Sequence, residues 1–196
     1  MGCTLPLPQQ KRCNPWQHQE LILVKEEQMS ELSASGTRQY LTFQLGDEIF
    51  AIDVANVREI LEYNSVTRVP RSPEYMRGVI NLRGSVVPVF DMRLKFGMAG
   101  TEKTINTCIV VVEVSYEGED IIIGALVDSV QEVFELEGSQ IEPAPRIGTH
   151  LRTEFIKGMG KKDERFIIIL DIDKVFSADE ITSVQDMTEE KTAATA

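Results

Sequence analysis

The chain has 196 residues, of which 42 % are hydrophobic and 26 % are charged, as is ordinary for a globular protein of one domain or two small ones. Its 31 acidic and 20 basic residues give a formal net charge of −11, which opposes nucleic-acid binding because Lys and Arg must neutralise the phosphates. No apolar run approaches the roughly 20 residues that span a bilayer, and the three scattered cysteines form no C-x-x-C pair, so we expect a reducing, cytoplasmic setting without direct membrane insertion.

Both ends of the chain are predicted to be flexible tails. Residues 1–36 are rich in Gln, Pro, Ser and Glu, and residues 183–196 are rich in Thr, Ala and Glu, without sustained periodicity in either segment. Residues 25–27 can be encoded by AAG-GAG-GAA, which resembles a bacterial ribosome-binding site just upstream of Met29. We therefore expect translation to start at Met29 and a folded body over residues 37–182.

The body begins with a predicted β-hairpin over residues 40–54. Apolar residues alternate on both sides of Gly46 and Asp47, which are residue types that favour turns. Residues 107–127 repeat this plan with a longer turn, which we place at residues 115–120.

The rest of the body is predicted to be mostly β as well. Residues 165–172, RFIIILDI, form a buried apolar strand. Short helical pieces are expected at residues 72–78 and 177–181, where a serine can cap the first turn.

A third predicted hairpin, residues 78–91, carries a charge within an apolar run, GVINLRGSVVPVFD. Gly84 can adopt the positive φ that tight turns need, which places Arg83 at or near the hairpin tip. Pro88 lacks an N–H group and favours an edge or bulge position. Arg83 is then either a solvated turn charge or a residue that binds a partner.

The body contains an internal repeat. Residues 74–96, EYMRGVINLRGSVVPVFDMRLKF, align without gaps with residues 154–176, EFIKGMGKKDERFIIILDIDKVF, at an offset of 154 − 74 = 80. Upstream, residues 51–62 match residues 124–135 at an offset of 124 − 51 = 73. Because the units follow the same order, we predict two similar small all-β subdomains that pack together.

The two copies differ at the hairpin tip. The second copy has the ordinary charged turn GKKDER, whereas the first has the compact NLRG between apolar residues. The first copy is therefore the specialised one, which raises the weight of a binding role for Arg83.

Catalytic chemistry has little support in the sequence. His18 lies in the N-terminal tail and His150 in a predicted loop, so no nucleophile has a plausible base. Asp171 and Asp173 form a D-x-D pair that could coordinate a divalent ion, although strand-end capping is the simpler interpretation. No glycine pattern matches a nucleotide-binding loop. We predict no cofactor and no bound metal.

A binding module remains, and its best surface is the stretch VREILE. Val57 and Ile60 are apolar and have Glu59 between them, whose carboxylate could pair with a partner's cation or with Arg83. The alternative is a buried strand with a solvated glutamate.

The sequence from about residue 38 to residue 181 resembles the CheW-type coupling proteins of bacterial chemotaxis. The resemblance rests on the ordered stretches YLTFQLGDEIFAIDVANVREI, VTRVPRSPEYMRGVINLRGSVVPVFDMR, GALVDSVQEV, IEPAP and FIKGMGKKDERFIIILDIDKVF. It implies two five-stranded SH3-like β-barrel subdomains with a shared apolar core and a few short helices. It also implies a non-enzymatic cytoplasmic scaffold, recruited to membrane-associated receptor arrays.

The resemblance further implies two partners and residues that contact them. One partner is the cytoplasmic tip of a chemoreceptor, and the other is the regulatory domain of a chemotaxis histidine kinase. The residues that match receptor-binding positions are Val57, Glu59, Ile60, Arg83, Cys108 and Val133. Those that match kinase-binding positions are Gly78, Ile141, Pro145 and Ile147.

Two positions depart from the family pattern. Cys108 stands where an aliphatic residue is common, and Glu142 stands where relatives can carry a basic residue. A coupling-like module of another two-component pathway is the alternative within the family. A metal-dependent enzyme that uses Asp171 and Asp173 is the remote alternative from another class.

Overall fold

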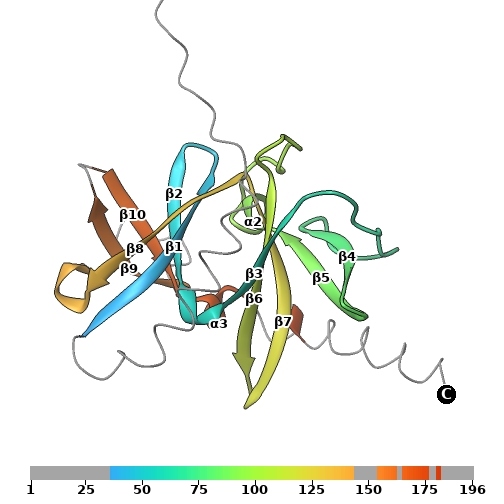
Figure 1. Ribbon diagram of the computed structural model, residues 1–196. Helices are drawn as coiled ribbons and strands as arrows, with labels where there is room; N and C mark the ends of the chain where they lie inside the picture. The colour runs from blue at the N-terminus through green and yellow to red at the C-terminus, as the bar shows by residue number, and fades with distance from the viewer. Residues whose placement is uncertain (1–35, 144–153, 163–164, 177–179, 182–196) are drawn as a thin grey trace, which may run out of the picture.

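The computed structural model describes residues 36–143, 154–162, 165–176 and 180–181, which form two five-stranded β-sheets side by side (Figure 1). In strand order, sheet A contains β8 (Ser129–Glu137), β1 (Thr37–Leu45), β2 (Glu48–Asp53), β10 (Arg165–Leu170) and β9 (Ile156–Lys162). Sheet B contains β3 (Val57–Glu62), β6 (Cys108–Tyr116), β7 (Glu119–Val127), β5 (Ser85–Asp91) and β4 (Met76–Leu82). The predicted all-β fold with two five-stranded units is confirmed.

Each sheet curls so that its two edges approach each other. Beyond β3, Thr67 forms an isolated bridge with Val79 of β4, with N···O distances of 2.9 and 2.8 Å. Beyond β8, Glu142 bridges to Met159 of β9 at 2.9 and 2.7 Å. These bridges satisfy backbone groups that an open sheet edge would leave unpaired.

The short helices α2 (Met92–Lys95) and α3 (Ile172–Val175) lie where strands end, and two 3-10 turns, η1 (Val54–Asn56) and η2 (Gly138–Gln140), accompany them. The predicted helix over residues 72–78 is wrong, because a turn closed by the Met76 N to Pro73 O hydrogen bond leads directly into β4. Of the second predicted piece, residues 180–181 are helical, and residues 177–179 lie outside the described residues.

The turn between β6 and β7 is tighter than the sequence suggested. Tyr116 pairs with Glu119, so only Glu117 and Gly118 connect β6 and β7. The six-residue turn predicted at residues 115–120 is therefore wrong. Both connecting residues have positive φ, 52° and 86°, which is the backbone geometry of a type I′ turn and suits the twist of the flanking strands.

The repeat is confirmed at the level of hydrogen bonds. Asp91 N donates to Tyr75 O at 2.7 Å, and 80 residues later Asp171 N donates to Phe155 O at 2.8 Å. Strands β1 to β5 with α2 thus correspond to strands β6 to β10 with α3.

The two repeats do not coincide with the two sheets, although the simplest form of our prediction assigns one subdomain to each repeat. Sheet A takes the hairpin β1–β2 from the first copy and β8, β9 and β10 from the second. Sheet B takes the hairpin β6–β7 from the second copy and β3, β4 and β5 from the first. Each copy therefore gives one hairpin to the sheet that the other copy mainly builds.

This exchange produces a shared apolar core. The central core cluster combines buried residues of β1 and β2 with those of β6 and β7, and α2 and α3 add Met92 and Ile172. Each sheet also encloses its own smaller cluster, around Tyr40 in sheet A and around Val111 in sheet B. Since burial of apolar surface is the main favourable term in folding, the central cluster holds the two sheets together.

Candidate functional site

The tip of the β4–β5 hairpin presents Arg83 to solvent. Leu82 pairs with Ser85, which leaves Arg83 and Gly84 as the turn residues, with φ of 52° and 96°. The Gly84 N–H donates to the Asn81 side chain at 2.8 Å and stabilises the turn. The predicted position of Arg83 at the tip is confirmed, and its side chain is 83 % exposed.

Arg83 lies next to Glu59, as one of our sequence interpretations suggested. The Arg83 Nη2 atom is 3.5 Å from Glu59 Oε2, and the Glu59 side chain is 16 % exposed. The pair joins the β4–β5 tip to β3, which lies at the opposite edge of sheet B in strand order. An ion pair this exposed contributes little to stability. Arg83 can therefore leave Glu59 and bind a group on another protein at a small cost in free energy.

The other predicted receptor residues belong to the central core cluster or pack against it. Val57 and Cys108 are buried in the central core cluster, and Ile60 and Val133 are half-buried against it. The structure therefore brings these four residues together on one core, although they come from β3, β6 and β8. Buried Val57 and Cys108 can act on a partner through the side chains that they position.

The predicted kinase residues are separated in the structure. Gly78 is buried on β4, where a Cβ atom would lie 2.1 Å from Thr67 O. Ile141 packs against the interior cluster of sheet A and closely approaches Gly158. Pro145, Ile147 and Met29 lie outside the described residues, as do the predicted tails apart from Gly36. Contact of these positions with a kinase stays a prediction.

The D-x-D pair is engaged by protein groups. Asp171 Oδ2 is 2.7 Å from Lys174 Nζ, and Asp173 Oδ1 accepts a 2.8 Å hydrogen bond from Ser115 N. Among the residues that the structure describes, no three His, Cys, Asp or Glu side chains gather in a way that could hold a metal ion. In the same part of the chain, no helix is long and apolar enough to cross a membrane.

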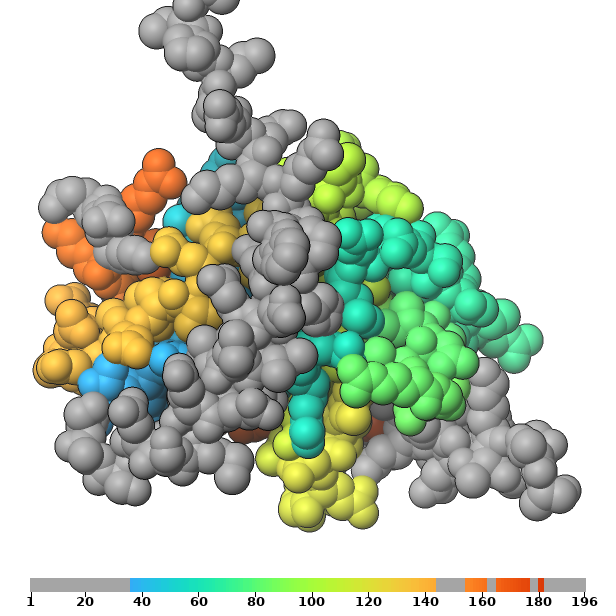
Figure 2. Space-filling view, viewed as in Figure 1, coloured from blue at the N-terminus to red at the C-terminus, as the bar shows by residue number. Residues whose placement is uncertain are grey.

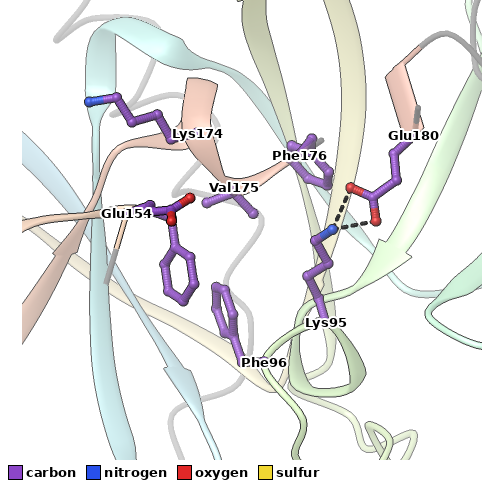
Figure 3. A pocket seen from close by; sticks show the side chains of 8 residues that line it. Lys95, Phe96, Glu154, Lys174, Val175, Phe176 and Glu180 are labelled. Carbon is purple, nitrogen blue, oxygen red and sulfur yellow. Dashed lines mark hydrogen bonds and ion pairs between the residues drawn. The ribbon is translucent and has the colours of Figure 1, made fainter. Parts of the chain in front are cut away.

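The sequence reasoning missed a charged cluster on the helices. Lys95 of α2 forms an ion pair with Glu180 in the wall of a cavity of about 400 Å³ (Figure 3). Burial, together with a hydrogen bond to Glu180 and the charge of Glu180, raises the pKa of Tyr75 to about 12. Lys95 and Glu180 are 85 residues apart, and the repeat equivalent of Lys95 is the apolar Val175, so no sequence signal pointed to the pair.

In the space-filling view, the strands of sheet A lie at the left and those of sheet B at the right (Figure 2). Arg83 and Glu59 both belong to sheet B, whereas Val133 comes from sheet A. The predicted receptor residues thus come from both sheets.

Comparison with known proteins identifies the family. The chain matches the family model described as a CheW-like domain over residues 39–180. It is 37 % identical over 150 residues to the chemotaxis protein CheW of Klebsiella aerogenes, and the alignment covers 76 % of this chain and 88 % of that protein. It is 34 % identical over 145 residues to the probable chemotaxis protein CheW of Rhizobium etli, with coverage of 74 % and 91 %.

A solved structure agrees with these relatives. The crystal structure of the scaffolding protein TtCheW from Thermoanaerobacter tengcongensis matches with a TM-score of 0.64 at 33 % identity. The match covers 73 % of this chain and 94 % of that one. This chain therefore belongs to the CheW family of non-enzymatic chemotaxis scaffold proteins.

Proposed function

We propose that this protein couples the cytoplasmic tips of chemoreceptors to a chemotaxis histidine kinase and thereby modulates the activity of the kinase. Membership of the CheW family supports a scaffold role in chemotaxis. The proposal adds the two partners, a cytoplasmic location with recruitment to receptor arrays, and the surfaces that bind each partner.

The observation that carries the proposal is the presentation of Arg83. A non-glycine residue rarely adopts positive φ, yet Arg83 does so at 52° on a tip where its side chain is 83 % exposed. Its neighbour Glu59 supplies a carboxylate, and Ile60, the residue that follows Glu59 on β3, is apolar and half-buried. Arginine is one of the residue types most enriched at the hot spots of protein interfaces.

Coupling by this protein links the conformational equilibria of the receptor and the kinase. A scaffold that binds receptor and kinase together can bias the kinase only if it binds the active and inactive states with different affinities. Contacts with micromolar dissociation constants, about −8 kcal/mol each, suffice where many copies act together in an array.

The kinase is proposed to meet a second surface. Gly78, Ile141, Pro145 and Ile147 are carried over from the family resemblance as its contact positions. Of these, Gly78 is buried on β4 of sheet B, and Ile141 follows η2 and packs against the interior cluster of sheet A.

The test is reconstitution with a chemoreceptor signalling fragment and a chemotaxis histidine kinase, with the phosphorylation rate as the readout. We expect a large dependence of the rate on this protein. Arg83→Ala should weaken receptor binding by about 2 kcal/mol, roughly thirtyfold in Kd, because truncation of an interface hot-spot residue to alanine costs that much.

Arg71→Ala is the matched control. Arg71 is an exposed arginine with positive φ, 64°, so the substitution has the same chemistry and a similar backbone setting. It should leave receptor binding unchanged. A kinase rate that does not respond to the wild-type protein would overturn the proposed function, and equal losses in both variants would remove Arg83 from the receptor site.

A further inference from the structure

The end of the described chain crosses from one sheet to the other. We call Phe176, Glu180 and Ile181 the C-terminal strap, since they follow α3, which comes directly after β10 of sheet A. The Phe176 ring lies 5.1 Å from the ring of Phe90, which belongs to β5 of sheet B. Ile181 is fully buried in the central core cluster. The strap therefore fastens a segment of the second repeat to strands of the first.

An ion pair between Lys95 and Glu180 also connects the strap to α2. Lys95, the last residue of α2, donates to both carboxylate oxygens of Glu180. The two side chains are only 14 % and 10 % exposed. Figure 3 shows the two side chains pointing toward each other, with Phe176 nearby.

Aromatic rings surround the cation of this pair. The Lys95 Nζ atom is 4.9 Å from the ring centroid of Tyr75 and 5.6 Å from that of Phe176. Both distances fall within the range of a cation–π interaction. Phe176 is itself part of the strap, so Lys95 contacts the strap through a carboxylate and through a ring.

The burial of the pair makes it sensitive to the loss of either charge. A buried ion pair stabilises little overall, but removal of one partner leaves the other charge in a poorly solvated place. The pair also forms part of the wall of the cavity of about 400 Å³.

We propose that Lys95 and Glu180 form a lock that holds the C-terminal strap against α2 and sheet B. When one of the two charges is removed, the strap detaches while both β-sheets stay folded. The inference concerns a conformational device of the fold and holds whatever partners the protein has.

The apolar anchors alone do not account for this arrangement. Phe176 and Ile181 would hold the strap equally well if apolar side chains stood at both positions 95 and 180, because no buried charge would then need a partner. The lock differs from simple apolar anchoring in one measurable respect. Removal of one charge, at position 95 or at position 180, should release the strap, whereas removal of both should not.

The test is hydrogen–deuterium exchange of the full chain, read by mass spectrometry in peptides that carry Phe176 to Ile181. We expect Lys95→Met to speed exchange in these peptides by about tenfold or more, since local opening is detected in this way. Exchange in the strands of both sheets should stay unchanged. Glu180→Gln is the milder variant and should give the same local effect, should Lys95→Met fail to fold.

Two further variants separate the lock from other effects. Lys174→Met removes a lysine that also lines the cavity, but its pair with Asp171 is exposed, so strap exchange should stay at the wild-type rate. The double variant Lys95→Met with Glu180→Met removes both charges and should recover most of the protection. Wild-type exchange in Lys95→Met, an equal increase across both sheets, or no recovery in the double variant would each overturn the proposal.

Discussion

Asp91 is a fully buried carboxylate whose oxygens are all engaged. It accepts a 2.9 Å hydrogen bond from Arg77 Nε and forms an ion pair with Arg77 Nη2 at 2.7 Å. It also accepts hydrogen bonds from the backbone and hydroxyl of Thr101 at 2.9 Å and from the N–H groups of Arg93 and Leu94. These bonds join β4, the start of α2 and the loop that leads to β6. A buried charge is tolerated where its partners are this complete.

We expect Asp91→Asn to lower the free energy of unfolding by about 3–5 kcal/mol. The neutral amide would leave the Arg77 cation without its partner, and its NH₂ group would face N–H donors. Urea unfolding followed by circular dichroism measures the change.

The repeat supplies the control for this substitution. Asp171 occupies the position equivalent to Asp91, but its side chain is 25 % exposed and pairs with Lys174, which is 63 % exposed. Asp171→Asn should therefore cost less than about 1 kcal/mol. Similar losses for the two variants would contradict the assignment of Asp91 as a buried structural hub.

At the scale of elements, Gly78 lets β4 approach the segment that follows β3. Its φ is 140°, and a Cβ atom there would lie 2.1 Å from Thr67 O and 2.7 Å from Thr67 C. The backbone bridge between Thr67 and Val79 depends on this close approach. A glycine is therefore required at this position by space as well as by conformation.

Gly78→Ala should destabilise the protein by about 3 kcal/mol or more, because the overlap with a backbone carbonyl adds to the strain at positive φ. Gly84→Ala is the matched control, since Gly84 has a φ of 96° but a methyl group added there would meet no atom within 4 Å. It should cost about 1 kcal/mol, from backbone strain alone. Thermal unfolding compares the two variants, and a larger loss for Gly84→Ala than for Gly78→Ala would refute the steric argument.

The sequence predicted which strands and hairpins form more accurately than it predicted the residues at which they begin and end. Alternating residues around Gly46 and Asp47 indicated the β1–β2 hairpin, and NLRG indicated the tip that carries Arg83. The turn between β6 and β7 was misjudged because Tyr116 and Glu119 are polar enough to resemble a loop, yet they pair across the hairpin. Local residue types do not report such pairing.

The contacts at the candidate site also depend on pairing that residue types do not report. The proximity of Glu59 and Arg83 was one of two alternatives, and it depends on sheet B curling until the segment beyond β3 bridges to β4. The Lys95 and Glu180 pair depends on a contact between the two repeats, which neither repeat carries in its own sequence. Contacts of this kind are set by tertiary packing, so residue spacing could not predict them.

At the scale of the whole molecule, the exchange of hairpins makes the two repeats interdependent. A repeat in the sequence says that two units share a plan, but not whether each unit completes its own sheet. Here the parallel pairs β2–β10 and β5–β7 both hold strands of different repeats together. In this structure, neither repeat completes a five-stranded sheet by itself.

Splitting the chain between the repeats tests this architecture. The exposed positions Glu102 and Lys103 lie between α2 and β6, and a break there keeps Thr101 with Asp91 in the first fragment. Fragments 1–102 and 103–196 should each lack a cooperative unfolding transition, because each leaves both sheets incomplete and the central core exposed.

When they are mixed, the two fragments should form a one-to-one complex that recovers the β-sheet signal in circular dichroism. The reason is that every strand pair that holds one repeat to the other, such as β1–β8 and β3–β6, can form without the broken loop. Independent folding of either fragment would show that its strands can form a stable unit without the other repeat. The exchange of hairpins would then be an arrangement that the molecule tolerates and not the source of its stability.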